Sequence, residues 1–353
     1  MSTPVNVADY ERLAAERLEA GLLGYYAGGA ADERTLCENV AAFARQRLLP
    51  RVLVDVGDVQ TSTTILGDDV ALPVLVAPTA LHGMAHADAE PGMARAASRA
   101  GTVFCLSSLA TTRPSEVAAA VPDGRRWFQL YVLKDRGVSR ALLDEAVASG
   151  FEAIVLTVDA PRAGRRERDL RTGFAVPADV DMPAIRAAVG APRCPTPAEF
   201  FELVDPTLTW RDLEQLVDES PVPVILKGVH AADDARRAVD HGAAGVIVSN
   251  HGGRQLDGVP ATIDLLPAVA AEIGEEALVL MDGGVRRGTD VLVALALGAQ
   301  AVLVGRPMLW GLTVDGTDGA GNVLELLREE VRLALTLLGA PTPADVGPHH
   351  ILR

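Results

Sequence analysis

The chain has 353 residues, of which 49% are hydrophobic and 22% charged, an ordinary globular composition with ample apolar material for a large core. Its formal net charge of −15 opposes binding to the phosphate backbone of nucleic acids, so we expect no nucleic-acid partner. The sequence contains neither a run of about 18 apolar residues nor a secretory leader pattern, which predicts a soluble cytoplasmic protein without a membrane contact.

The three cysteines, Cys37, Cys105 and Cys194, are far apart in the sequence. An odd number of cysteines at such spacing fits neither a disulfide framework nor a pattern of metal ligands. We therefore expect no metal site.

Residues 1–70 precede the regular part of the chain and predict an N-terminal helical extension. A first helix is expected to begin near Asn6. The sequence GYYAGGA, residues 24–30, is expected to form a loop, and a second helix is expected around DERTLCENVAAFARQRL, residues 32–48.

From Leu72 onward, short apolar runs alternate with helix-like stretches. The helix-like stretches are rich in alanine and each ends in glycine, a common residue at the end of a helix; they cover 88–101, 139–150, 231–242 and 288–298. The apolar runs are continuous rather than alternating, as expected for parallel strands buried on both faces. They cover 73–80, 103–108, 126–132, 153–160, 223–229, 245–252, 278–284 and 301–307.

Strands that alternate with helices indicate a parallel α/β sheet. Eight such units over about 270 residues predict a closed (β/α)8 TIM barrel. An open doubly wound sheet is the alternative, but no strand–GxGxxG–helix fingerprint supports its dinucleotide-binding version. We expect a single domain over 1–353, with the helical extension at 1–70 and the barrel at 71–340.

The connection from Pro161 to Trp210 is too long for a simple turn. Loops of this length are commonly lids or disordered segments. This one follows the fourth predicted strand, at the face of a barrel that carries catalysis. We therefore expect residues 161–210 to form a lid loop, with disorder of its proline-rich middle as an alternative.

Polar residues gather where the predicted strands end. In a barrel these ends converge on one face, and a merely structural barrel has no reason to direct so many polar groups to one place. The residues are Pro78, Thr79, Ala80, Ser107, Ser108, Gln129, Tyr131, Thr157, Asp159, Lys227, Ser249, Asn250, His251, Asp282, Gly305 and Arg306.

The last two strand ends favour a phosphate. Loops after strands seven and eight are the usual phosphate site of such barrels, because backbone amides and helix N-termini can approach the anion there. The alternative is a pair of ordinary glycine turns with solvent-facing arginines. The residues concerned are Gly283, Gly284, Arg286 and Arg287 of DGGVRRG, with Gly305 and Arg306.

The sequence GVIVSNHGGRQLDG, residues 245–258, places His251 at the end of an apolar strand. A neutral imidazole suits a general base, and Gly252 and Gly253 leave room for a ligand. Arg254 can present its planar fork to a carboxylate, and Asp159 can orient the imidazole. No positioned serine or cysteine nucleophile is evident. The pattern favours removal of a proton or hydride from the α-carbon of a small acid.

Only two lysines occur in the chain, Lys134 and Lys227, against 30 arginines. A remaining lysine therefore suggests a need for a compact ammonium. Beside a flavin, Lys227 would stabilise negative charge on the reduced ring. The competing interpretation is a lysine that forms a Schiff base, as in barrel aldolases.

The motif SNHGGRQLDG closely resembles the active-site signature of the FMN-dependent (S)-2-hydroxy acid oxidases and dehydrogenases, a family that includes glycolate oxidase, lactate oxidase and mandelate dehydrogenase. Other segments resemble the family's motifs in the family's order, so the resemblance covers nearly the full chain. These segments are YYAGGAADERTLCEN, APTALHGMAH, WFQLYV, TVDAPRAGRRERDLR, LKGV, DGGVRRG and VGRPMLWGL.

The resemblance implies a role for each residue of the site. His251 would be the catalytic base and Asp159 its partner, with Tyr25, Arg166 and Arg254 on the substrate carboxylate and Tyr131 on the substrate hydroxyl. Lys227 would lie near the flavin ring. The remaining FMN-binding residues would be Pro78, Thr79, Ala80, Ser108, Gln129, Thr157, Ser249 and Asp282, with Gly283, Gly284, Arg286, Gly305 and Arg306 at the phosphate.

Two departures from glycolate-oxidase-like members bear on the substrate. Where those members carry SSWA, this chain has Leu109 in place of the tryptophan, and where they carry PRLGRR, it has Ala163 in place of the leucine. Both changes replace a larger side chain by a smaller one and predict room for a group larger than that of glycolate. HGMAH resembles lactate oxidases. Ala80 occupies a position where oxidases of the family tend to carry alanine and some dehydrogenases glycine.

We therefore expect FMN-dependent oxidation of lactate-like or larger, even aromatic, (S)-2-hydroxy acids, with O2 reduced to H2O2. The alternatives are a dehydrogenase with another electron acceptor, a lactate 2-monooxygenase, a barrel that binds without catalysis, and a phosphosugar aldolase. The resemblance also implies a homotetramer or homo-octamer.

Overall fold

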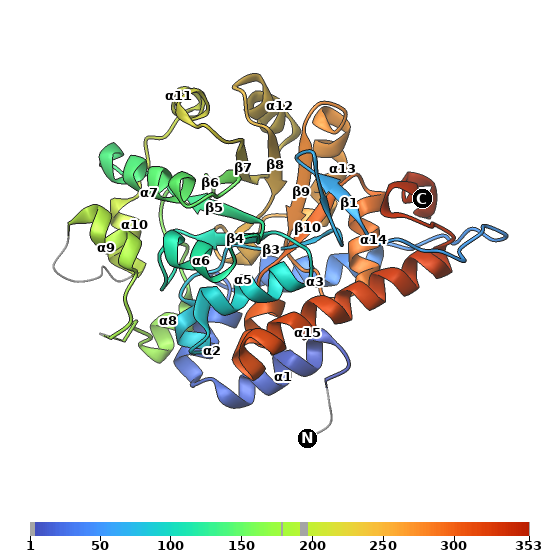
Figure 1. The fold of residues 1–353 in the computed structure, drawn as a ribbon, viewed down its shortest axis with the longest axis horizontal. Helices are drawn as coiled ribbons and strands as arrows, with labels where there is room; N and C mark the ends of the chain where they lie inside the picture. The colour runs from blue at the N-terminus through green and yellow to red at the C-terminus, as the bar shows by residue number, and fades with distance from the viewer. Residues whose placement is uncertain (1–3, 178, 191–196, 353) are drawn as a thin grey trace.

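The computed structural model describes residues 4–177, 179–190 and 197–352. Eight parallel strands close a barrel in the order β10-β3-β4-β5-β6-β7-β8-β9, which confirms the predicted (β/α)8 fold and excludes an open sheet (Figure 1). Each predicted apolar run contains one strand. The strands are β3 (Val74–Val76), β4 (Phe104–Ser107), β5 (Arg126–Leu130), β6 (Ala153–Thr157), β7 (Val224–Val229), β8 (Gly245–Val248), β9 (Leu278–Asp282) and β10 (Ala301–Val304).

The register of the barrel aligns the polar strand ends. Thr157 pairs with Lys227 across β6 and β7, and Ser107 pairs with Gln129 across β4 and β5. A register shift interrupts the pairing of β7 with β8 between Lys227 and Val229. Neighbouring strands therefore deliver their last polar side chains at the same end of the barrel.

The strands are mostly apolar because both of their faces are buried. One face packs inside the barrel, where Trp127, Val155 and Leu280 belong to one cluster, and the other packs beneath the helices. A short antiparallel hairpin, β1 (Thr63–Ile65) and β2 (Asp68–Val70), was not predicted, since strands of three residues leave little periodicity to detect. Ile65 and Val70 join the interior cluster and close the barrel where its strands begin.

Helices surround the barrel. The four helix-like stretches correspond to α5, α7, α12 and α14. In the figure α15 runs beside α1 and α5, against which it packs (Figure 1). The helices are α4 (His82–Ala85), α5 (Ala89–Arg99), α6 (Pro114–Ala120), α7 (Arg136–Ala148), α11 (Trp210–Glu219), α12 (Ala232–Asp240), α13 (Thr262–Ile273), α14 (Gly288–Ala296) and α15 (Arg306–Leu338), followed by the turns η3 (Pro343–Asp345) and η4 (Pro348–His350).

The N-terminal extension is helical, as predicted, and its first helix begins directly after Asn6, whose side chain accepts a hydrogen bond from Asp9 N at 3.0 Å. The expected loop at 24–30 is partly wrong: residues 24–27 form the last turn of a helix, because Gly28 N bonds Gly24 O at 2.8 Å and Tyr25 and Tyr26 pack into the core. The elements are α1 (Val7–Arg17), α2 (Ala20–Ala27), α3 (Arg34–Ala41) and η1 (Ala42–Arg45).

In its described residues, the segment at 161–210 contains three short helices, α8 (Glu167–Thr172), α9 (Pro183–Val189) and α10 (Pro197–Leu203). Backbone contacts hold its end to the barrel, since Lys134 N bonds Leu203 O at 2.8 Å. Part of the middle, for which disorder was the alternative, lies outside the described residues. Over the described ranges, no helix is long and apolar enough to cross a membrane.

Candidate active site

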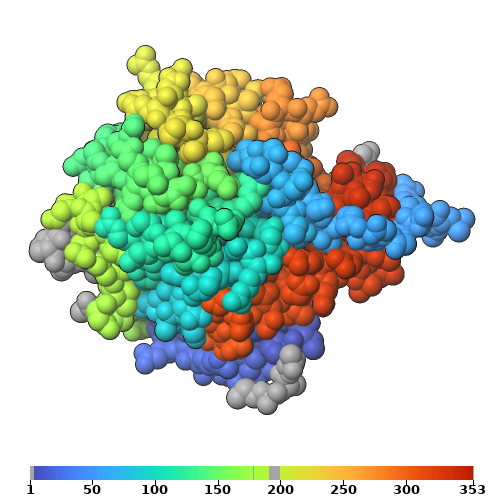
Figure 2. Space-filling model, viewed as in Figure 1, coloured from blue at the N-terminus to red at the C-terminus, as the bar shows by residue number. Residues whose placement is uncertain are grey.

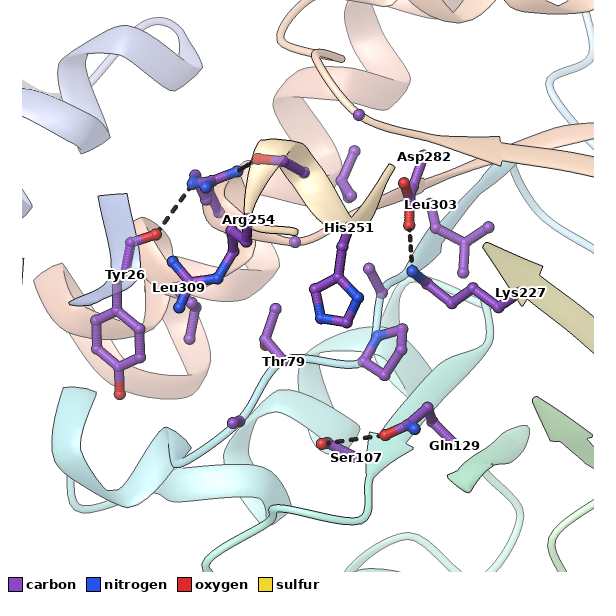
Figure 3. Close-up of a pocket in the computed structure, with 18 of the residues that line it drawn as sticks. Tyr26, Thr79, Ser107, Gln129, Lys227, His251, Arg254, Asp282, Leu303 and Leu309 are labelled. Atoms are coloured by element: carbon purple, nitrogen blue, oxygen red, sulfur yellow. Dashed lines mark hydrogen bonds and ion pairs between the residues drawn. The ribbon is translucent and has the colours of Figure 1, made fainter. Parts of the chain in front are cut away.

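A pocket opens at the end of the barrel where the strands terminate, and each of the eight strands contributes to its wall by its own residues or by those that follow it. Figure 3 shows part of the lining. The extension adds residues from α2, and the 161–210 segment adds two more. The lining comprises Tyr25, Tyr26, Ala77, Pro78, Thr79, Ala80, Ser107, Leu109, Gln129, Tyr131, Thr157, Arg166, Phe201, Lys227, His251, Gly252, Arg254, Asp282, Gly283, Gly284, Val285, Arg286, Leu303, Val304, Gly305, Arg306, Pro307 and Leu309.

The structure brings the expected site residues together at this pocket. All of them line it except Asp159, Ser108 and Ser249, which lie directly behind the lining. Asp159 contacts His251, Ser249 accepts a hydrogen bond from Lys227, and the Ser108 hydroxyl donates to the backbone carbonyl of Gln129 at 2.6 Å. These three residues therefore act on the pocket through the groups that they hold.

His251 and Asp159 form a pair, with 3.0 Å between Nδ1 and Oδ1. Burial favours a neutral carboxyl at Asp159, but His251 and Lys227 outweigh it, and the pKa of Asp159 is lowered. An ionised carboxylate only accepts, so Nδ1 of His251 carries the proton and Nε2 keeps a lone pair. Burial also lowers the pKa of His251, against the opposing effect of Asp159. The imidazole is therefore neutral near pH 7, as a base must be.

The turn that carries His251 has an unusual backbone. His251 has φ 58°, and it is followed by two glycines with φ 63° and 75° in η2 (His251–Gly253). A non-glycine residue in this region costs about 1–3 kcal/mol and persists only where its surroundings hold it. Here the Ser249 hydroxyl accepts from His251 N at 3.1 Å.

The same motif anchors the N-terminal extension. The side chains of Asn250 and Asn39 exchange two hydrogen bonds, both of 2.8 Å. A Cβ atom on Gly253 would lie 2.6 Å from Leu36 N, so the close approach of α3 requires glycine there. Asp257 accepts from three backbone amides at the start of α3, the shortest at 2.8 Å from Thr35 N. Part of SNHGGRQLDG is therefore structural.

Lys227 is buried and its ammonium is paired. Its Nζ lies 3.0 Å from Asp282 Oδ2 and donates to Ser249 Oγ at 2.7 Å (Figure 3 shows the ion pair). Burial lowers the pKa of Lys227, but Asp282 and Asp159 outweigh it, and the pKa is raised overall. A Schiff base requires a neutral amine, so this environment disfavours the aldolase alternative.

Three guanidinium groups concentrate positive charge in the other half of the pocket. Burial lowers the pKa of Arg286, that of Arg306 well below its usual range, and that of Arg254 to about 10. After burial, the nearby cations contribute, Arg166 for Arg254 and Arg254 for Arg306. An anion bound in the pocket would oppose these effects and raise the pKa of the arginines again.

The arginines differ in what they contact. Arg306 donates to the carbonyls of Tyr26, Gly252 and Gly28, and Nη1 of Arg254 donates to those of Tyr25 and Gly28, so both bind the end of α2. Arg286 lines the pocket, whereas Arg287 is exposed and pairs with Glu330 at 3.0 Å. The alternative of solvent-facing arginines thus describes Arg287 and not Arg286.

Three aromatic rings, those of Tyr25, Tyr131 and Phe201, form part of the pocket wall. The guanidinium carbon of Arg254 lies 5.1 Å from the ring centre of Tyr25, and that of Arg166 lies 5.8 Å from the ring centre of Phe201. Tyr131 packs edge-on against Phe201 at 5.8 Å. Burial raises the pKa of Tyr131, which keeps its hydroxyl protonated as a donor.

Two lining residues lie away from the strand ends and were not predicted. Phe201 comes from the 161–210 segment and Tyr26 from α2, so neither follows a strand. The repeated aromatic of EFFEL and GYY was the only available signal. The interpretation of Ala163 was wrong: this residue is exposed and absent from the pocket wall, because the chain after Asp159 turns outward, whereas Leu109 does line the pocket.

Fold and site together define a (β/α)8 barrel whose pocket brings together an imidazole, a buried ammonium and several guanidinium groups. The family model described as FMN-dependent dehydrogenase matches residues 14–353. The chain is 46% identical to an L-lactate oxidase from Nostoc sp., over 98% of this chain and 97% of the relative, and 44% identical to 2-hydroxyacid oxidase 1 from Homo sapiens, over 94% and 92%.

Solved structures agree with this result. A mandelate oxidase with (S)-2-phenylpropionate aligns with a TM-score of 0.90 at 42% identity, over 99% of this chain and 98% of that one. The chain therefore belongs to the FMN-dependent dehydrogenase family, which confirms the resemblance and makes FMN its cofactor.

The pocket fits FMN. Among the described residues, Gln129 Nε2 and Asp282 Oδ1 are buried without a hydrogen-bond partner, and both residues line the wall where a polar ring system would lie. The guanidinium groups of Arg286 and Arg306, with Gly283, Gly284 and Gly305, supply a cationic end with little side-chain bulk for a phosphate.

Proposed function

We propose that this protein oxidises (S)-2-hydroxy acids to 2-oxo acids with FMN and passes the electrons to O2. The hydroxy acid loses two electrons and two protons, and O2 takes up both to give hydrogen peroxide. The observation that carries the proposal is the His251–Asp159 pair, since its neutral imidazole faces the same pocket as Lys227 and Arg254. The relatives named oxidases of lactate, glycolate and mandelate support it.

In the proposed reaction, one pair of residues transfers the proton and the others bind the substrate. Nε2 of His251 removes a proton from the substrate, and Asp159 stabilises the resulting imidazolium. Arg254 and Arg166, with Tyr25, bind the substrate carboxylate. Tyr131, kept protonated by burial, donates to the substrate hydroxyl.

The chemistry that bound FMN supplies is the acceptance of two electrons. Lys227 stabilises negative charge beside the ring. We propose that the ring is held by Pro78, Thr79, Ala80, Ser108, Gln129, Thr157, Ser249 and Asp282, and the phosphate by Gly283, Gly284, Arg286, Gly305 and Arg306.

We propose a lactate-like or larger acid as the substrate. Leu109 lines the same pocket as Tyr131 and Phe201, and a leucine leaves more space than the tryptophan of glycolate-oxidase-like members. An apolar wall of this kind suits a methyl group, a longer alkyl chain or a phenyl ring.

The deciding experiment is the visible spectrum of the purified protein under argon. (S)-Lactate, glycolate and (S)-mandelate are added in turn, with (R)-lactate as the control, and air is then admitted. We expect the yellow colour to bleach with one of the (S) acids and to return in air with one equivalent of peroxide. Bleaching without recovery in air would indicate another acceptor, recovery without peroxide would indicate a monooxygenase, and no bleaching with any acid would refute the proposal.

We further propose that the chain forms one catalytic domain over 1–353, acts in the cytoplasm and assembles as a homotetramer or homo-octamer. One exposed apolar feature supports the assembly. Val52 and Leu53 are 83% and 103% exposed in the loop 49–60, which projects from the rest of the molecule (Figure 2).

A further inference from the structure

His230 is a titratable residue that the proposed mechanism does not use. It follows β7, is half-buried, and does not belong to the pocket wall. Its Nε2 lies 2.8 Å from the backbone oxygen of Ser249. A carbonyl oxygen only accepts, so Nε2 carries the proton and donates it to Ser249.

Ser249 accepts hydrogen bonds from three residues around the pocket, Lys227, His230 and His251. It is completely buried, and its hydroxyl accepts from Lys227 Nζ at 2.7 Å and from His251 N at 3.1 Å. With the bond from His230, both the side-chain oxygen and the backbone oxygen of Ser249 are held. The bond joins the end of β7 to the end of β8.

The position matters because the strained turn begins two residues later. His251 takes a left-handed backbone conformation, and its ring reaches Asp159 only while the turn keeps that shape. Such conformations persist where the surroundings over-determine them. Among the groups that lower the pKa of Asp159 against burial, His230 follows His251 and Lys227.

We propose that His230 is a positioning residue for the base: its N–H bond to Ser249 holds the turn that directs His251 into the pocket. This inference rests on the proposed function, in which His251 is the base. It requires an N–H donor at position 230 and not an imidazole as such.

Three variants of the holoenzyme test it. His230→Leu removes the donor, His230→Gln keeps an N–H donor on a side chain of similar reach, and His241→Leu removes another half-buried histidine, which stacks on Trp210 away from the pocket. Amide hydrogen exchange of residues 249–254 measures the turn. Stopped-flow bleaching under argon with (S)-lactate and (S)-mandelate gives the limiting rate and the half-saturating concentration.

We expect His230→Leu to raise exchange in 249–254 and to lower the limiting rate at least tenfold, with FMN content unchanged and the half-saturating concentration within twofold. His230→Gln should restore both readouts to within threefold, and His241→Leu should match the wild type. Unchanged exchange or rate in His230→Leu, or equal damage in His230→Gln, would overturn the inference. If neither acid bleaches the flavin of the wild-type protein, the proposed function is refuted instead. Amide hydrogen exchange then still shows whether His230 holds the turn.

Discussion

At the scale of single residues, the proposed chemistry depends on the ionisation of His251. Burial places its pKa below the usual range, so the imidazole stays neutral, and the rate of flavin reduction should persist as the pH is lowered through 6.5 and fall only as it passes the lowered pKa. The sign follows because protonation removes the lone pair that accepts the substrate proton.

His251→Ala should keep FMN and lose turnover by about 10²–10⁴-fold, the usual contribution of a general base. The anaerobic bleaching rate across pH 4–9 measures it, with the flavin spectrum as the control for cofactor content. A rate within tenfold of the wild type would remove His251 as the base.

The buried pair of Lys227 and Asp282 makes a prediction about stability. Both side chains are about nine-tenths buried or more, with 6% and 10% exposed. Removing one partner leaves the other charge unpaired, so Lys227→Met should lower the free energy of unfolding by about 3–5 kcal/mol. Denaturant titration measures this, and the double variant Lys227→Met with Asp282→Asn should recover part of the loss. A double variant that is less stable than Lys227→Met alone would contradict the pairing argument.

Among the elements, the extension matters because α2 carries Tyr25 into the pocket, and α3 packs through Leu36 against Gly29, just after α2, and Gly253. Asp257 lies outside α3 in the sequence but accepts from the amides at its start, as a helix cap does. Asp257→Ala should therefore destabilise the docking of α3 by about 0.5–2 kcal/mol. Limited proteolysis around residues 28–34 and the half-saturating substrate concentration should both increase.

The matched control is Asp32→Ala, whose carboxylate lies nearby but is mostly exposed and pairs only with Arg34 among the described residues. It should behave as the wild type. Equal proteolysis of the two variants would show that Asp257 does not hold α3.

In the whole molecule, the loop 49–60 projects away from the rest of the chain (Figure 2). It leaves the barrel beside the end of α15, where Arg51 N bonds Leu338 O at 2.8 Å, and its Val52 and Leu53 side chains are almost fully exposed. Leu333 and Leu337 of α15 are also exposed, at 59% and 66%. Neighbouring exposed apolar side chains of this kind commonly mark an interface.

Val52→Asp with Leu53→Asp should therefore reduce the native mass, which we expect to be four or eight times the 37.0 kDa of one chain. Light scattering after gel filtration measures the mass. Leu170→Asp, a change at a 63% exposed leucine of α8, is the control. A wild-type monomer, or an unchanged mass in the double variant, would refute the assembly through this loop.

The amino-acid sequence alone is enough to predict the barrel and most of the residues around its pocket. Parallel strands buried on both faces read as continuous apolar runs, a local property, and the polar residues toward the end of each run must lie at the common end of the barrel. Pro78, Gln129, Lys227 and His251 were therefore found without coordinates, and the outcome agrees with the structure.

Contacts between segments far apart in the chain became visible only in the tertiary structure. It placed Phe201 in the wall and Ala163 outside it, directed Arg306 to the carbonyls of α2, and joined His230 to Ser249. The physical reason is that burial and hydrogen-bond partners depend on which surfaces pack together, and no local periodicity in the sequence records that packing.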